Sequence, residues 1–168
     1  LPRMKEGGLD GGFWVIYTPQ GPLTQDGYAR ALKEARQRNA VIDKMVRDAP
    51  DDFALAVQGQ DARAIIAQGK RVVYKSIENA YPLGEDLSLL DEFYAAGVRM
   101  VGLVHTRNNQ FSDSSTDSGG QKWGGLSPLG KELIARANAL GMVVDLSHAH
   151  DDALEQAMAL PETPSILS

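Results

Sequence analysis

One junction recurs three times along the chain and constrains its fold more than any other feature. A helical segment ends at a glycine, and a β-branched strand then begins; the strands are Val72–Ile77, Val98–Val104 and Met142–Ser147. Glycine readily adopts the left-handed conformation that closes a helix. Helix followed by strand, repeated, is typical of βα units and predicts a parallel sheet covered by helices.

The remaining segments predict further elements of the same kind. Phe13–Tyr17 is aromatic and β-branched, which indicates a buried strand, and Thr24–Asp48 has the 3.6-residue apolar period of a long helix. Asp61 and Ser127 are residue types that cap helix N-termini. The shorter elements that we expect are a strand over Phe53–Val57, a helix over Asp151–Leu160 and a strand over Pro164–Ser168.

The length of the chain limits how much of a fold it can form. Its 168 residues, 43% of them hydrophobic, suit one globular domain with a real core. A complete α/β barrel usually takes about 250 residues. We therefore expect residues 1–168 to be an interior part of a single, longer catalytic domain.

Composition excludes several classes of function. The net charge is −5 with scattered Lys and Arg, which argues against a nucleic-acid-binding face. No apolar run approaches the roughly 20 residues of a membrane span. The chain has no cysteine, so a metal would have to be held by His, Asp or Glu. This composition fits a bacterial protein and leaves cytoplasm and periplasm both open.

Three of the predicted strands stop on a residue that can bind metal or move protons. These residues are Glu78, His105 and His148. The C-terminal ends of parallel strands share one face of an α/β protein, and that face carries the active site. The pattern therefore predicts two imidazoles and a carboxylate in one cleft.

Each of these residues also has a purely structural interpretation. Glu78 could bridge two divalent cations, or it could pair with a lysine at the surface. A lone histidine at a strand end, such as His148, is more often structural than ligating. His105 could bind metal or donate a hydrogen bond to a developing oxyanion. His150 fits a helix cap or a surface position better than a ligand.

The segment 106–126 is the longest connection, and it is rich in Ser, Asp and Gly. Long connections at the C-terminal end of a strand often form the lids and walls of sites. Phe111 and Trp123 favour a partly ordered loop over a disordered insertion. Within this loop we expect Asn108 and Asp113 to line a pocket and contact substrate.

Several stretches, taken in order, carry a specific resemblance. They are Leu1–Gly8 with Gly12–Pro19, Ile77–Asn79, Phe93–Arg99 with His105 and Asn108, Gly125–Gly130, and Leu140–His148. Together they resemble the membrane dipeptidase (renal dipeptidase) family of binuclear zinc peptidases. The resemblance implies an α/β fold, a TIM-type (β/α)8 barrel of the metal-dependent hydrolase kind, of which the chain would cover about strands 2 to 6.

The resemblance also implies a zinc-dependent dipeptidase that uses two Zn²⁺ ions and a hydroxide shared between them. Glu78 matches the carboxylate that bridges both metals, and His148 matches a metal ligand. His105 matches the histidine that contacts substrate and steadies the intermediate. One departure stands out, because Asn79–Ala80 replaces a common Gly-Gly pair and is expected to alter the pocket.

Other parts of the family pattern have no counterpart in the chain. They are an earlier His-x-Asp pair, a later metal-binding His, and an Arg and an Asp that serve the substrate. We therefore expect residues 1–168 alone to lack peptidase activity. A dipeptide is the expected partner, and a homodimer is left open. The alternatives are a related metal-dependent amide or lactone hydrolase and a non-catalytic barrel-type binding protein.

Overall fold

An all-parallel sheet organises the computed structural model, which describes residues 2–160 and 165–168. Across the sheet the strands are β1 (Gly11–Tyr17), β3 (Arg71–Glu78), β4 (Val98–Gly102), β5 (Val143–Asp145) and β6 (Ser165–Ile166). A short strand, β2 (Phe53–Leu55), pairs with the first residues of β3. Every strand pairing is parallel, which confirms the predicted βα organisation.

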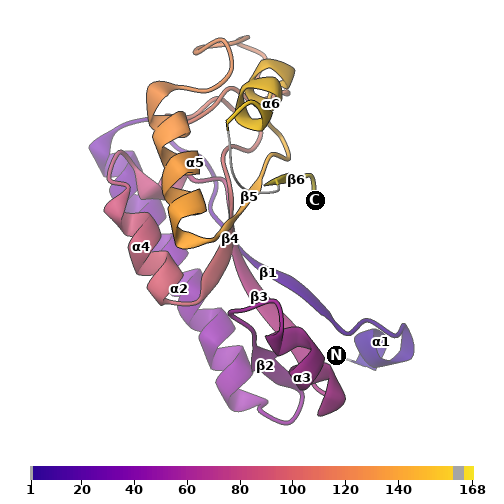
Figure 1. The fold of residues 1–168 in the computed structure, drawn as a ribbon. Helices are drawn as coiled ribbons and strands as arrows, with labels where there is room; N and C mark the ends of the chain where they lie inside the picture. Colours follow the sequence, from indigo (N-terminus) through magenta and orange to yellow (C-terminus); the bar gives the residue numbers. More distant parts are fainter. Residues whose placement is uncertain (1, 161–164) are drawn as a thin grey trace.

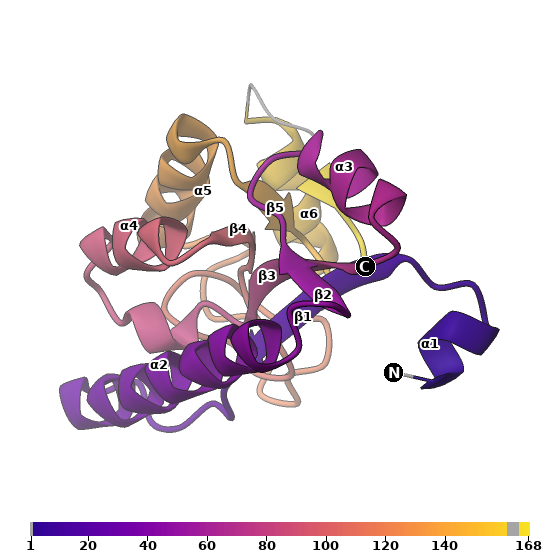
Figure 2. The same ribbon diagram turned by 90° about the horizontal axis from the view of Figure 1, so that it is seen from below.

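Helices alternate with these strands along the chain. They are α1 (Pro2–Glu6), α2 (Gln25–Asp48), α3 (Asp61–Ala67), α4 (Ser88–Ala95), α5 (Pro128–Leu140) and α6 (Asp151–Met158), with a 3₁₀ turn at Tyr81–Leu83. Figures 1 and 2 show α2, α4 and α5 along one side of the sheet. The main core lies between these layers, where Val101 of β4, Phe93 of α4 and Leu133 of α5 are fully buried.

The helix ends follow from local chemistry at most positions. Ser127 caps α5 by accepting a hydrogen bond from Gly130 N, Pro128 occupies the first turn, and Gly141 closes the helix with φ 70°. Asp61 differs from the prediction, because it is the first residue of α3 and not its cap. Its carboxylate instead accepts from the backbone amides of Val57 and Gln58.

Two strands end earlier than their sequences predict. β4 stops at Gly102 and β5 at Asp145, although apolar residues continue in both segments. Past Gly102, side chains donate hydrogen bonds to backbone carbonyl oxygens that would otherwise accept from a neighbouring strand. Asn109 donates to Leu103 O and Ser114 donates to His105 O. The final strand is confirmed at Ser165–Ile166, and Pro164 lies outside the described residues.

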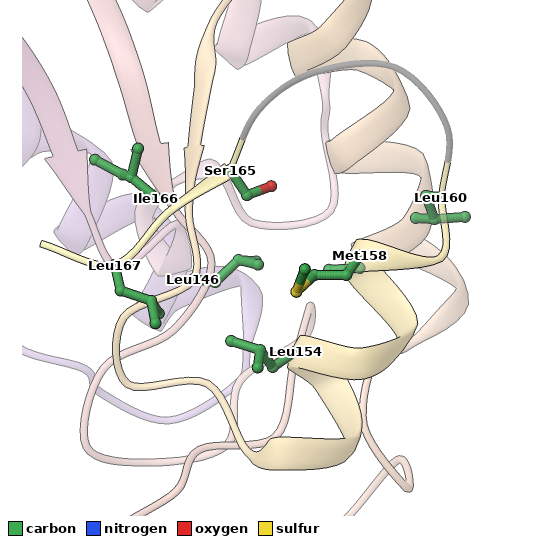
Figure 3. Close-up of a pocket in the computed structure, with 8 residues that line it drawn as sticks. Leu146, Leu154, Met158, Leu160, Ser165, Ile166 and Leu167 are labelled. Carbon is green, nitrogen blue, oxygen red and sulfur yellow. The ribbon is translucent and has the colours of Figure 1, made fainter.

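An apolar hollow of about 490 Å³ lies between α6 and the β6 edge of the sheet (Figure 3). Leu146, Leu154 and Ile166 line it, and Met158 and Leu167 at its margin are largely exposed. None of the helices in residues 2–160 and 165–168 is long and apolar enough to cross a membrane.

Gly130 provides a test of the packing between α5 and the 106–126 loop. A Cβ atom at this position would lie 2.0 Å from Phe111 O. Replacing glycine by alanine inside a helix usually gains about 1 kcal/mol. Here we expect Gly130→Ala to lower the free energy of unfolding by about 1–3 kcal/mol, because the helix must move away from the loop.

Urea unfolding of the wild-type protein and of the Gly130→Ala variant measures this difference. Gly12→Ala is the control, since a Cβ there meets no atom within 4 Å, and its midpoint should hardly move. An unfolding midpoint that rises for Gly130→Ala would contradict the close approach.

Candidate metal centre

The C-terminal ends of three neighbouring strands meet at one place. Glu78 is the last residue of β3, His105 follows β4 after two buried residues, and His148 lies three residues beyond β5. The parallel pairing of β3 with β4 and of β4 with β5 brings these ends together. The three residues predicted to share a cleft therefore do share one.

Both imidazoles face the same oxygen of the carboxylate. His148 Nε2 lies 3.2 Å from Glu78 Oε1, and His105 Nε2 lies 3.4 Å from it. The two imidazole rings are 4.2 Å apart between centroids and tilted by 56°. All three side chains are partly exposed, so a ligand can reach them from solvent.

The surroundings keep His105 in its neutral form. Burial lowers the pKa of His105, and the neighbouring His148 lowers it further, while Glu78 opposes both effects. Its Nδ1 atom is buried and has no hydrogen-bond partner among the described residues. A neutral imidazole has a free lone pair, which is the form that binds a metal.

The donor set suits a divalent metal such as zinc. One ligand atom from each of Glu78, His105 and His148 lies within 4.8 Å of the others. Imidazole nitrogen and carboxylate oxygen are ordinary zinc ligands, and zinc sites in proteins commonly combine them. The residues present therefore fit the metal that the sequence resemblance implies.

Two residues at the site have left-handed backbone conformations although neither is glycine. Asn79, which directly follows Glu78, has φ 69°, and His148 itself has φ 67°. Such conformations are uncommon for residues with a Cβ atom and persist where the surrounding structure enforces them. The site is thus built on backbone that is held in place by its neighbours.

Asn79 connects the end of β3 to the 106–126 loop. It is fully buried, and its Oδ1 atom accepts from Asn109 Nδ2 at 3.0 Å and from Tyr81 N at 3.3 Å. Asparagine tolerates the left-handed region better than most residues do. Its presence where the sequence resemblance implies a glycine is therefore compatible with the same backbone path.

The 106–126 loop is ordered by hydrogen bonds within it. Its two aromatic residues had indicated a partly ordered loop. Phe111 is fully buried, and Trp123 Nε1 donates to Asn109 O at 2.8 Å. The side chain of Asn108 bonds Ser114 N and Gly120 O. Figure 1 shows this segment beside α6, to which it is tied through Gln156.

Asp113 lies at the centre of this loop. Its side chain is fully buried, and both carboxylate oxygens accept hydrogen bonds from backbone amides of the loop. This geometry does not favour the predicted contact between Asp113 and the substrate. The substrate contacts of Asp113 and of Asn108 both stay predictions. His150 is the N-cap of α6 and accepts from Asp152 N, in agreement with its predicted role as a cap.

Sequence reasoning missed Tyr17 as a member of the site. Its ring lies 5.0 Å from the His105 ring between centroids, at an angle of 61°. Tyr17 is the last residue of β1 and pairs in register with Glu78. The rule that selected the other strand ends would have found it, had it included the ionisable phenol of tyrosine.

Comparison with known proteins finds one family that matches the whole sequence. The model of the membrane dipeptidase family (peptidase family M19) matches residues 1–168. Dipeptidase tcpJ from Claviceps purpurea is 30% identical over 173 residues, which cover 100% of this chain and 40% of the fungal protein. The chain therefore spans less than half the length of this relative.

Solved structures show the same fold. The probable dipeptidase PvdM from Pseudomonas aeruginosa superposes with a TM-score of 0.92 and 36% identity, over 99% of this chain and 44% of that one. A metallopeptidase from Rhodobacter sphaeroides, bound to a phosphinate mimic of the dipeptide L-Ala-D-Ala, superposes with a TM-score of 0.86 and 27% identity. This match covers 99% of this chain and 54% of that one. The predicted fold class, part of a TIM-type barrel, is confirmed.

The left-handed conformation of Asn79 can be tested through the free energy of unfolding of two variants. Both Asn79→Gly and Asn79→Ala remove the bonds to Asn109 and Tyr81, but only alanine keeps a Cβ atom at φ 69°. We expect the alanine variant to unfold with a free energy lower than that of the glycine variant by about 1–2 kcal/mol. Urea unfolding of both variants checks this difference, and equal stabilities would contradict the backbone strain.

Proposed function

The chain belongs to the membrane dipeptidase family, and from this premise we propose that the intact protein is a zinc-dependent dipeptidase. The observation that carries the proposal is the convergence of His105 and His148 on one oxygen of Glu78. Two partly exposed histidines beside a carboxylate offer the nitrogen and oxygen donors that zinc sites combine.

Glu78 and His148 are proposed to hold the metal. The carboxylate of Glu78 stands at the end of β3 and would bridge two ions, as the family resemblance implies. His148 presents Nε2 from a backbone that its neighbours fix in the left-handed region. When bound, zinc supplies a water of lowered pKa, about 7, and polarises the carbonyl that is to be attacked.

His105 is proposed to contact the substrate. Its lowered pKa keeps it neutral near pH 7, and one nitrogen of a neutral imidazole carries a proton. That N–H can donate to the carbonyl oxygen as negative charge develops on it. The Tyr17 ring packs against His105 and limits how far it can turn. Asn108 and Asp113 remain as substrate contacts predicted from the sequence alone.

The complete site needs residues beyond those described. These residues span 40% of the Claviceps purpurea relative and 44% of the Pseudomonas aeruginosa one, so we propose that 1–168 form part of a single catalytic barrel domain. A second zinc and its ligands, and the groups that bind the substrate termini, are proposed to come from the remainder of that domain. We also propose that the intact protein binds two zinc ions and that it comes from a bacterium.

The substrate class can be tested directly. The dipeptide mimic bound to the Rhodobacter sphaeroides relative supports a dipeptide as substrate. We expect the full-length protein to cleave dipeptides in a panel of L,L and L,D compounds and to leave lactones intact. Product release measured by chromatography decides the matter. Lactone cleavage without dipeptide cleavage would favour the related hydrolase class, and no cleavage at all would favour a binding protein.

Glu78→Gln tests the metal-bridging role. The amide is neutral and nearly isosteric, so the fold should persist while the site loses its negative charge. We expect zinc content and dipeptidase activity to fall together, with activity at least about 100-fold lower, because metal ligation and its chemistry depend on the same group. Elemental analysis and initial rates measure the two effects.

Glu132→Gln is the matched control, because it makes the same change on the exposed surface of α5. It should leave both measurements unchanged. Two zinc ions still bound by the Glu78→Gln variant would refute the bridging role.

A further inference from the structure

The backbone that carries His148 is held by a loop from elsewhere in the chain. The carbonyl oxygen of His148 accepts from Ser115 N at 2.9 Å, and His150 N donates to Asp113 O at 3.0 Å. Ser114 and Ala149 form an antiparallel bridge between these two bonds. Residues 113–115 therefore run alongside 148–150 and fix the left-handed turn at His148.

The other side of the 113–115 segment is held in the same way. Asp113 N donates to Gly125 O at 2.9 Å, and Ser112 forms an antiparallel bridge with Leu126. The segment around Asp113 is thus the middle of three, with 122–126 on one side and 148–150 on the other. A change in its position is transmitted through backbone bonds to His148.

The carboxylate of Asp113 fixes the outer segment. Oδ1 accepts from Lys122 N at 2.8 Å, and Oδ2 accepts from Trp123 N and Gly125 N at 2.9 Å each. The side chain is 0% exposed. A buried carboxylate is costly unless it is hydrogen-bonded, and three amide donors supply that compensation.

We infer that Asp113 is a positioning residue for His148, an inference that rests on the proposed metal-binding role of that histidine. The carboxylate folds the 106–126 loop into a shape whose inner segment holds the 148–150 backbone. That backbone directs Nε2 of His148 toward Glu78. Asp113 thus acts on the metal site through the backbone hydrogen bonds that join its loop to residues 148–150.

Asp113→Asn in the full-length protein tests the inference. An asparagine side chain has one acceptor oxygen, so its NH₂ group would face at least one of the three N–H donors. We expect zinc affinity, measured by competition with a chromophoric chelator, to fall about 10- to 100-fold. The urea midpoint of the metal-free protein reports separately on any general loss of stability.

Asp117→Asn is the matched control. Asp117 lies in the same loop and also accepts from two backbone amides, those of Asn108 and Gly119 at 2.8 Å, but it is not bonded to the 148–150 segment. Its replacement should leave zinc affinity unchanged. Equal zinc affinities for the two variants would overturn the inference, and the metal-binding role of Glu78 and His148 would still stand.

A double-mutant cycle with His148→Ala separates positioning from general damage. If Asp113 acts through His148, Asp113→Asn should lower zinc affinity in the wild-type background and have no further effect in the His148→Ala background. Equal losses in both backgrounds would refute the inference. If His148→Ala alone leaves zinc affinity unchanged, the ligand role itself is wrong, and the inference falls with it.

A second variant keeps the test decisive if Asp113→Asn does not fold. Ser115→Pro removes the one amide that donates to His148 O and leaves Asp113 and its carboxylate bonds in place. It should also lower zinc affinity in the wild-type background only. Unchanged affinity for this variant would show that the loop does not position His148.

Discussion

The candidate metal site depends on the convergence of His105 and His148 on a single oxygen of Glu78. No stretch of chain could create it locally, because the three residues come from three strands. Parallel pairing of β3 with β4 and of β4 with β5 sets these strand ends at the same edge. The helices on one side of the sheet bury the apolar side chains that keep that pairing in register.

Sheet pairing brings the strand ends together, but it does not orient the side chains. His148 lies beyond the last ladder bond of β5, in a conformation that costs an ordinary residue about 1–2 kcal/mol. Hydrogen bonds from the 106–126 loop offset that cost. The same loop reaches Asn79 through Asn109, so one segment contacts both left-handed residues of the site. The loop therefore determines the fine geometry that the sheet leaves open.

Local chemistry made much of this predictable from the sequence. The cap at Ser127, the glycine at 141 and the strand-end position of Glu78 all depend on residues close together in the chain. Other features depend on distant partners. Asp61 is a residue type that caps helices, yet its carboxylate accepts from the backbone amide of Val57, upstream of the helix. The sequence likewise does not indicate that the carboxylate of Asp113 accepts from amides of its own loop. Sequence patterns identify a polar group but not which of several donors it will bind.

Asn79 illustrates how such a choice can change a site without changing its stability. Glycine at this position would remove the strain of the left-handed backbone, which is smaller for asparagine than for most residues, and the buried Nδ2 group that has no partner among the described residues. It would also remove the bonds that Oδ1 accepts, each worth about 1 kcal/mol. These effects oppose one another. What differs is the fully buried side chain directly after Glu78, joined to the loop. Replacing a common glycine here therefore acts on the shape and rigidity beside Glu78 more than on the stability of the fold.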